Sequence, residues 1–171
     1  RKSMKGATMD IKLVREIKKV GVGALHRWQA KQNPPTILTH LNSADLRTVN
    51  FVNAELTNVD FSGADLRGVS FGAARIQGCI FRGADLQGAN LSCVTFLSPP
   101  PTSIFSLRAD FSGADLRGAL LAGVDFDHVS FEGADLRGVR LFTIGTELAN
   151  ANIAGADLRG TVLDKPPRPT S

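Results

Sequence analysis

The sequence predicts an all-β solenoid, in which the chain winds into stacked coils. A Leu, Ile or Phe falls every five residues from Leu46 to Phe96, and the same spacing resumes at Phe111. A small residue (Ala, Val or Cys) stands two places before each of these positions between Leu46 and Phe96. A five-residue period fits neither an amphipathic helix nor a single strand, so it indicates a repeat architecture.

The coil length follows from the most regular unit, which reads Ala-Asp-Leu-Arg-Gly or nearly so. This unit begins at Ala44, Ala64, Ala84, Ala114, Ala134 and Ala156. The successive spacings are 20, 20, 30, 20 and 22 residues. They predict a 20-residue coil with about ten extra residues after Phe96 and two more after Leu141. With these residues set aside, Leu86 stacks on Leu116 and each column of core residues becomes uniform.

The ten extra residues are predicted to form a loop over residues 97–106. This stretch holds three prolines, which cannot donate to a β-ladder, so the loop should leave the coil at a corner. Ile104 and Phe105 would lie at its tip, and loops carried on rigid scaffolds often hold function. The smaller insertion falls around residues 142–147, where Gly145 permits an unusual turn.

The repeated unit resembles that of the pentapeptide-repeat family, which is often written A-[DN]-L-x-x. The resemblance covers roughly residues 41–164. It implies a right-handed quadrilateral β-helix, with one unit on each of the four sides of a coil. The central Leu or Phe and the small residue before it would point inward, and the chain would form about six coils.

The opening segment differs from the rest of the chain in charge. Residues 1–35 hold nine Lys or Arg against two acids, a net charge of +7. Residues 36–171 hold eleven against fourteen, a net charge of −3. Asp10 is a candidate helix N-cap, and the run Asn33-Pro34-Pro35 would end the helix.

We expect this basic segment to cap the solenoid. Gly21 and Gly23 would kink or divide the helix. A cap would cover the apolar end and the unpaired β-edges of the first coil. Binding to nucleic acid, a membrane surface or an acidic protein is the other interpretation, and both roles can coexist. The apolar residues near one helix face are Ile11, Val14, Ile17, Leu25 and Trp28.

The sequence therefore divides into a basic N-terminal helical cap (1–35), a β-helix (36–164) and a Pro-rich tail (165–171). The last inward position is Leu163, and prolines follow it almost directly. We expect the final coil to be uncovered, and two such ends could bury each other in a homodimer. The chain begins at Arg1, which fits a piece of a longer protein.

Charged residues flank the most regular column of core leucines. An Asp stands one place before each of these leucines, and an Arg, or Gln87 in one coil, stands one place after it. Like charges about 5 Å apart repel, so alternating signs predict a charge-balanced, solvated face. The other interpretation is a docking face for a charged partner, with Arg67, Arg117 and Arg137 as candidate contacts.

A second candidate contact surface is apolar. Leu120 and Phe142 map to outward positions of neighbouring coils on one face. An exposed pair of this kind can mark a contact site, although single exposed apolar residues are common. The loop tip at Ile104 and Phe105 is the stronger candidate.

No set of residues predicts catalysis, and we expect no cofactor, metal or small-molecule substrate. Cys79 takes an inward position and Cys93 a corner position, which favours two reduced structural thiols. The three histidines show no metal-ligand spacing with these cysteines. The recurrent glycines fall at corners and precede no Gly-Lys-Ser or Gly-Lys-Thr. No run approaches the roughly 18 apolar residues of a membrane span, and nothing resembles a secretory signal, so a cytoplasmic location is expected.

Two function classes remain. The leading prediction is a non-enzymatic protein–protein interaction or scaffold module built on a rigid β-helix. The alternative, implied by the resemblance, is the branch that protects DNA gyrase from quinolones by mimicking duplex DNA. The solenoid body from Ala44 to Asp164 carries nine Arg against fourteen acids, but its arginines alternate with aspartates and the N-terminal arm is basic. Both features work against mimicry of a continuous anionic surface, so nucleic-acid mimicry and nucleic-acid binding are the weaker expectations.

Overall fold

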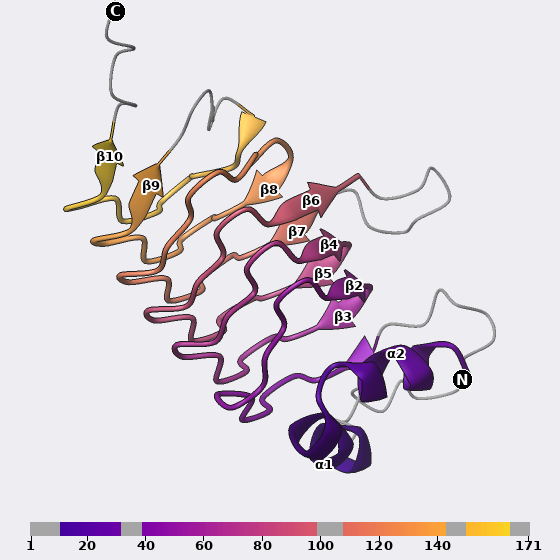
Figure 1. The fold of residues 1–171 in the computed structure, drawn as a ribbon. Helices are drawn as coiled ribbons and strands as arrows, with labels where there is room; N and C mark the ends of the chain where they lie inside the picture. Colours follow the sequence, from indigo (N-terminus) through magenta and orange to yellow (C-terminus); the bar gives the residue numbers. More distant parts are fainter. Residues whose placement is uncertain (1–10, 32–38, 99–107, 143–149, 165–171) are drawn as a thin grey trace, which may run out of the picture.

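The computed structural model describes residues 11–31, 39–98, 108–142 and 150–164 (Figure 1). Two helices come first, α1 (Ile11–Val20) and α2 (Gly23–Gln29). Short strands follow, each on one side of a coil. They are β1 (Thr39–His40), β2 (Glu55–Thr57), β3 (Val59–Asp60), β4 (Arg75–Gln77), β5 (Cys79–Ile80), β6 (Thr95–Leu97), β7 (Ala109–Asp110), β8 (Val129–Ser130), β9 (Arg140–Phe142) and β10 (Val162–Asp164).

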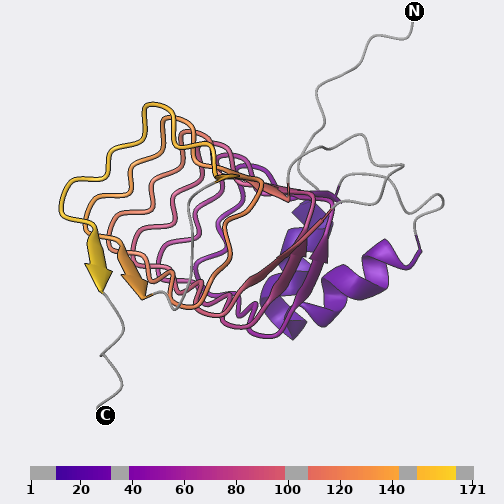
Figure 2. The same cartoon turned by 90° about the horizontal axis from the view of Figure 1, so that it is seen from above.

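The strands stack in parallel, each on the strand one coil below it. One sheet has the order β1-β3-β5-β7-β8, a second has the order β2-β4-β6, and a third pairs β9 with β10. In the second sheet Glu55 lies opposite Arg75, and Arg75 lies opposite Thr95, steps of 20 residues. Figure 2 shows the successive coils following nearly the same outline. The fold is therefore the predicted all-β solenoid.

The register confirms both insertions. Asp85 forms a bridge with Asp115, 30 residues later, and the Leu86 N–H donates to the Asp115 carbonyl at 2.7 Å. Leu86 and Leu116 therefore stack as neighbours, as predicted. The second insertion appears as the bridge between Asp135 and Asp157, 22 residues apart.

The long loop lies mostly outside the described residues. Leu97, which the sequence places at the start of the loop, is the last residue of β6 and pairs with Gln77. The described chain resumes at Arg108. Ile104 and Phe105 fall in the gap, so their prediction as a contact site stays a prediction.

A phenylalanine stack runs through the core past the loop. The rings of Phe61, Phe81, Phe111 and Phe131 are at most 2% exposed. Their centroids are separated by 5.0, 4.5 and 5.4 Å in that order, with nearly parallel ring planes. The spacing across the loop, from Phe81 to Phe111, is the shortest of the three. The loop therefore leaves the solenoid without opening its core.

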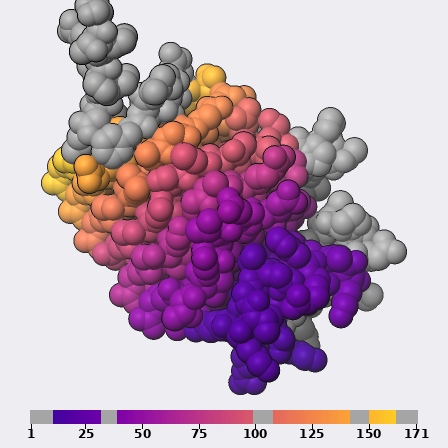
Figure 3. Space-filling view, in the orientation of Figure 1, coloured from indigo at the N-terminus to yellow at the C-terminus, as the bar shows by residue number. Residues whose placement is uncertain are grey.

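The N-terminal cap consists of two helices. Gly21 has φ +80° and separates α1 from α2, as the sequence suggested. The helices bury Leu13 and Leu25, together with Ile17 and Ala24. The sequence placed Ile11 on the buried face, but Ile11 is 55% exposed. Figure 3 shows the helices gathered at one end of the molecule.

Side chains of the cap form hydrogen bonds with the first described coil of the solenoid. His26 Nε2 donates to the Glu55 carbonyl at 2.8 Å, and Gln29 Nε2 donates to the Thr57 carbonyl at 2.8 Å. Gln29 also contacts the hydroxyl of the buried Thr39 at 3.2 Å. These bonds satisfy acceptors of β2 that have no strand below them in the described residues. The predicted helical cap is thus present.

The C-terminal coil is more exposed than the coils beneath it. Leu158 is 37% exposed, whereas Leu136, one level below in the same column, is 4% exposed. Ile153, also in this coil, is 37% exposed. A small apolar hollow opens here. It is lined by Leu121, Phe126, Phe131, Leu136, Val139, Leu141, Leu158 and Thr161.

Neither described helix has the length and apolar character needed to cross a bilayer.

Candidate functional site

The charged residues beside the leucine column, with Gln87 at one level, lie in a line that we call the charge ladder. Each arginine binds the aspartate of its own coil, and all but Arg159 also approach the aspartate of the next described coil. Arg117 Nη2 lies 2.7 Å from Asp115 Oδ2, and Arg117 Nε lies 3.6 Å from Asp135 Oδ2. Arg137 repeats this geometry at 2.6 and 3.6 Å. The ladder comprises Asp45, Arg47, Asp65, Arg67, Asp85, Gln87, Asp115, Arg117, Asp135, Arg137, Asp157 and Arg159.

The ladder aspartates also have a backbone role. Asp115 Oδ1 accepts the backbone N–H of Arg117 at 3.1 Å. Other sides of the coil use the same contact, with Asn90 Oδ1 accepting from the Ser92 N–H at 2.9 Å. A side-chain oxygen that accepts an N–H two residues on is the Asx-turn contact. Sequence reasoning missed this role, although the Asp or Asn before several of the core residues was its signal.

The arginines hold the ladder carboxylates ionised. Hydrogen bonds from Arg117 lower the pKa of Asp115, with burial opposing the shift. At the last coil, hydrogen bonds from Arg159 lower the pKa of Asp157 from 3.8 to about 2. A carboxylate fixed in this way is a poor general acid or base near neutral pH. The ladder geometry supports the charge-balanced interpretation of this face.

Asp157→Asn should flatten the loss of stability in acid. A carboxyl whose pKa is lowered by folding contributes stability above its unfolded pKa of 3.8, and this contribution is lost as the pH falls toward about 2. The variant keeps an Oδ1 acceptor for the Arg159 N–H but cannot titrate. Thermal melting of wild type and variant between about pH 4 and pH 2 tests this expectation. Parallel pH profiles would contradict it.

Gln87 leaves one level of the ladder without an arginine. Asp85 accepts the backbone N–H of Gln87 at 3.2 Å, and its arginine contact comes from the coil below, where Arg67 Nε lies 3.5 Å away. Asp115 is bridged directly above Asp85. Two carboxylates therefore face each other across this step without a guanidinium between them.

Gln87→Arg should raise the melting temperature at low salt, because it places a cation between Asp85 and Asp115. The gain should shrink as added salt screens the pairs. Gln87→Glu is the matched variant, and it should lower the melting temperature by adding a third carboxylate. Calorimetry at low and high salt makes the comparison. Equal shifts for both variants would show that charge does not set the effect.

Asp110 in β7 is a buried carboxylate. Its side chain is 6% exposed and contacts Arg82 Nε at 2.5 Å. Its Oδ1 also accepts from the Ser112 hydroxyl at 2.6 Å and from the Ser112 N–H at 3.0 Å. Burial raises the pKa of Asp110, but the hydrogen bonds from Ser112 and Arg82 outweigh it and the net shift is downward. The group is a structural anion within the coil stack.

Arg108 anchors the C-terminal base of the long loop. Its side chain is 19% exposed, and its guanidinium lies 3.3 Å from Asp125 Oδ2 and 3.2 Å from Asp127 Oδ2. Its carbonyl accepts the Gly78 N–H at 3.0 Å. These ion pairs could not be predicted from the residue pattern, because they depend on where the chain re-enters the coil after the loop.

The structure does not bring the predicted contact residues into one site. Arg67, Arg117 and Arg137 lie along the charge ladder, each engaged by aspartates. Leu120 is half-buried, and it bridges Asn90 below and Arg140 above through its backbone. Phe142 ends β9 on the same side of the coil, and the orientation of its side chain lies outside the described part. Docking through any of these residues stays a prediction.

The cysteines are both free thiols. Cys79 is buried, and burial raises the pKa of its thiol to about 12. Cys93 is exposed at a corner, with φ +57°. Among the described residues, no cluster of His, Cys, Asp and Glu could hold a metal ion.

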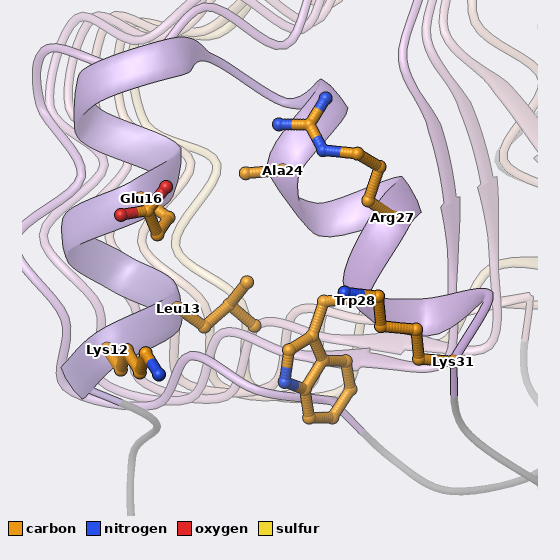
Figure 4. Close-up of a pocket in the computed structure, with 7 residues that line it drawn as sticks. All are labelled: Lys12, Leu13, Glu16, Ala24, Arg27, Trp28 and Lys31. Atoms are coloured by element: carbon orange, nitrogen blue, oxygen red, sulfur yellow. The ribbon is translucent and has the colours of Figure 1, made fainter.

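A groove lies between the two cap helices on the side away from the coils. Its volume is about 320 Å³. Leu13, Ala24 and Trp28 form its apolar part, and charged side chains surround them (Figure 4). The charged lining residues are Lys12, Glu16, Arg27 and Lys31. Sequence reasoning missed this groove, because it exists only through the mutual orientation of α1 and α2.

Family comparisons match the solenoid on both sides of the loop. A family model described as pentapeptide repeats in nine copies matches residues 41–96, and one with eight copies matches residues 108–141. The chain belongs to the pentapeptide-repeat family. No curated protein matches it. The two matched ranges flank the long loop of this pentapeptide-repeat protein, in agreement with the observed register.

Several solved structures are similar to this pentapeptide-repeat protein. One is a pentapeptide repeat protein from the thylakoid lumen of Arabidopsis thaliana, with 27% identity over 70% of this chain and 72% of that chain, and a TM-score of 0.47. Another is HetL, a pentapeptide repeat protein involved in heterocyst differentiation regulation, from the cyanobacterium Nostoc sp. strain PCC 7120. It has 27% identity over 73% of this chain and 53% of that chain, and a TM-score of 0.41. A third is QnrB1, a plasmid-mediated fluoroquinolone resistance protein, with 21% identity over 74% of this chain and 78% of that chain, and a TM-score of 0.29.

Proposed function

We propose that this pentapeptide-repeat protein is a non-enzymatic interaction or scaffold module. The observation that carries the proposal is the pairing of the charge ladder, where Arg117 and Arg137 each bind the aspartate of their own coil and approach the next. Charged groups that could do chemistry are engaged in holding one coil to the next. What remains is a stiff body with an unbroken core, suited to presenting surfaces to another protein.

The remaining polar groups also support a structural role. A catalytic set needs a nucleophile or base with an orienting group beside a space for the reacting atom. Asp110 contacts Arg82 and Ser112 but is buried and held as an anion. The buried Cys79 carries a thiol whose pKa is raised, the opposite of an activated nucleophile. Two free thiols fit the cytoplasmic location expected from the sequence.

Affinity capture followed by mass spectrometry tests the proposal. The bait variants are wild type, a deletion of residues 97–106, and the triple reversal of Arg67, Arg117 and Arg137 to Glu. We expect wild type to retain a specific protein, and one folded variant to lose it. Circular dichroism must show intact folding of each bait. Capture of the same proteins by all three baits would remove both the loop and the ladder as docking surfaces.

Gyrase protection is the alternative function. A DNA mimic needs a nearly continuous anionic surface, and the ion pairs of Arg117 and Arg137 interrupt it on the most regular face. A supercoiling assay with purified gyrase and ciprofloxacin decides between the two functions. We expect no protection by wild type, and protection that depends on residues 97–106 would establish the alternative instead.

We also propose that the C-terminal coil supports homodimerisation. Leu158 and Ile153 are each 37% exposed at this end, and a two-fold contact would bury both copies of them. Leu158→Asp should shift a concentration-dependent dimer to monomer in analytical ultracentrifugation. Val52→Asp, at an exposed position on the side of the solenoid, is the control and should leave the dimer intact. A monomeric wild type at high concentration would exclude the dimer.

A further inference from the structure

We propose that the groove between α1 and α2 binds an acidic peptide segment that carries an apolar anchor residue. This inference rests on the proposed interaction function and names a surface and a partner class for it. The groove has a volume of about 320 Å³. That is the lower range of ligand pockets, enough for one or two large side chains rather than for a folded domain.

The lining of the groove defines the chemistry of its occupant. Leu13 and Ala24 are buried, at 3% and 6% exposure, and together with the half-buried Trp28 they form an apolar floor. In Figure 4 the Trp28 indole lies between Leu13 and Lys31. Aromatic side chains at the centre of a groove commonly receive the anchor residue of a partner. An apolar side chain of the partner would sit here.

The rim of the groove is cationic. Lys12, Arg27 and Lys31 surround the floor on different sides (Figure 4), and Glu16 is the one acid among the lining residues. Residues 11–31 carry six Lys or Arg against this one Glu, a net charge of +5. Carboxylates on either side of the partner's anchor would meet these cations, and opposite potentials speed association and fix orientation.

The capping contacts do not use the groove. Lys18 binds Asp45 at 3.0 Å, and His26 and Gln29 bind carbonyls of β2. None of these three side chains lines the groove. The cap can therefore hold the first coil and present the groove at the same time.

A peptide fits this groove better than nucleic acid or a lipid surface. The apolar floor calls for an inserted apolar side chain, which a line of phosphates does not supply. The apolar floor is recessed between two helices, whereas membrane binding uses an apolar face that protrudes into the lipid. A large apolar side chain between flanking carboxylates would contact both the apolar floor and the cationic rim of the groove.

Trp28 provides a direct readout, because it is the only tryptophan in the chain and no tyrosine is present. The probe is a decapeptide of Glu and Asp around a central Leu-Phe pair, titrated into the full chain. We expect a saturable change in Trp28 fluorescence. The same peptide with Ser-Ser at its centre, and the same peptide with Lys in place of its acids, should each bind at least about tenfold more weakly.

Matched charge reversals separate the groove from general attraction. Arg27→Glu/Lys31→Glu should weaken the decapeptide at least about tenfold, whereas Arg15→Glu/Lys19→Glu, which changes the net charge equally outside the groove, should weaken it far less. Lys12→Ala/Lys31→Ala is a milder second variant, and circular dichroism checks each fold. Equal losses for both reversals, or equal binding of the Ser-Ser peptide, would overturn the proposal.

Two further probes identify other occupants. Single-stranded DNA, or vesicles containing phosphatidylserine, binding more tightly than the decapeptide would overturn the peptide assignment. If the decapeptide fails while affinity capture still yields a specific partner, the groove inference is wrong and the interaction function stands. If capture fails and the decapeptide binds, the groove is a binding site without the scaffold role.

Discussion

Replacing Phe81 by Ala should lower the free energy of unfolding by about 3–5 kcal/mol. The ring is fully buried, and its centroid lies 5.0 Å from that of Phe61 and 4.5 Å from that of Phe111. Truncation would remove the stacking contacts above and below and leave a cavity at the level where the long loop departs. Urea unfolding followed by far-UV circular dichroism measures the change.

Val52→Ala is the control for this substitution. Val52 is 41% exposed on the outside of the solenoid, so its truncation should change stability by no more than about 0.5 kcal/mol. A loss of under about 1 kcal/mol for Phe81→Ala would show that the coils on either side of the loop are not coupled through this stack.

Deleting residues 1–31 should make the protein associate with itself. The deletion uncovers the Glu55 and Thr57 carbonyls, which accept hydrogen bonds from His26 and Gln29 in the full chain. It also exposes the underside of the first coil, where Leu41 and Leu46 are fully buried. An uncovered edge of parallel strands next to apolar surface is a template for pairing with another chain.

Sedimentation velocity over a range of concentrations compares the truncated and full chains. We expect larger species for the truncated chain, growing with concentration. The control is Lys12→Ser/Lys31→Ser, which lowers the charge of the cap but leaves its buried residues in place, and it should sediment as wild type does. A truncated chain that sediments in the same oligomeric state as the full chain and melts at the same temperature would show that the cap does not prevent self-association.

The repeats made the register predictable. Each column contains several copies of one residue type, so a wrong alignment at the loop would have mixed Phe with Leu in several places at once. The bridge between Asp85 and Asp115 bears out the alignment with ten residues removed. The position of the N-terminal cap was predictable for a related reason, since a stack of coils leaves an apolar end that some segment must cover.

The cap's own packing was less predictable. The sequence-based prediction put the apolar residues of 11–28 near one helix face, which placed Ile11 inward. Gly21, with φ +80°, ends α1 and restarts the helical phase in α2. Ile17 is buried as predicted, but its buried neighbour in α1 is Leu13, one turn earlier, and not Ile11. A prediction from periodicity fails where a break changes the direction of the axis.

Contacts between distant segments could not be predicted either. Arg108 reaches Asp125 and Asp127 because the chain re-enters the coil beside them. The cap groove requires the relative placement of Lys12 on α1 and Arg27 on α2. Neither arrangement has a fixed sequence spacing, whereas the local contact from Asp115 to the Arg117 N–H does, and it could have been read from the repeat.

The two ends of the solenoid differ, with Leu46 fully buried at one end and Leu158 37% exposed at the other. In a stack stabilised by nearest neighbours, the coil with the fewest contacts opens first. The described solenoid should therefore fray first at the coil that carries Leu158, and its middle and capped end should unfold last. Local unfolding should thus start at one end of the solenoid and spread toward the other. A protein bound to the coil that carries Leu158 would therefore slow unfolding.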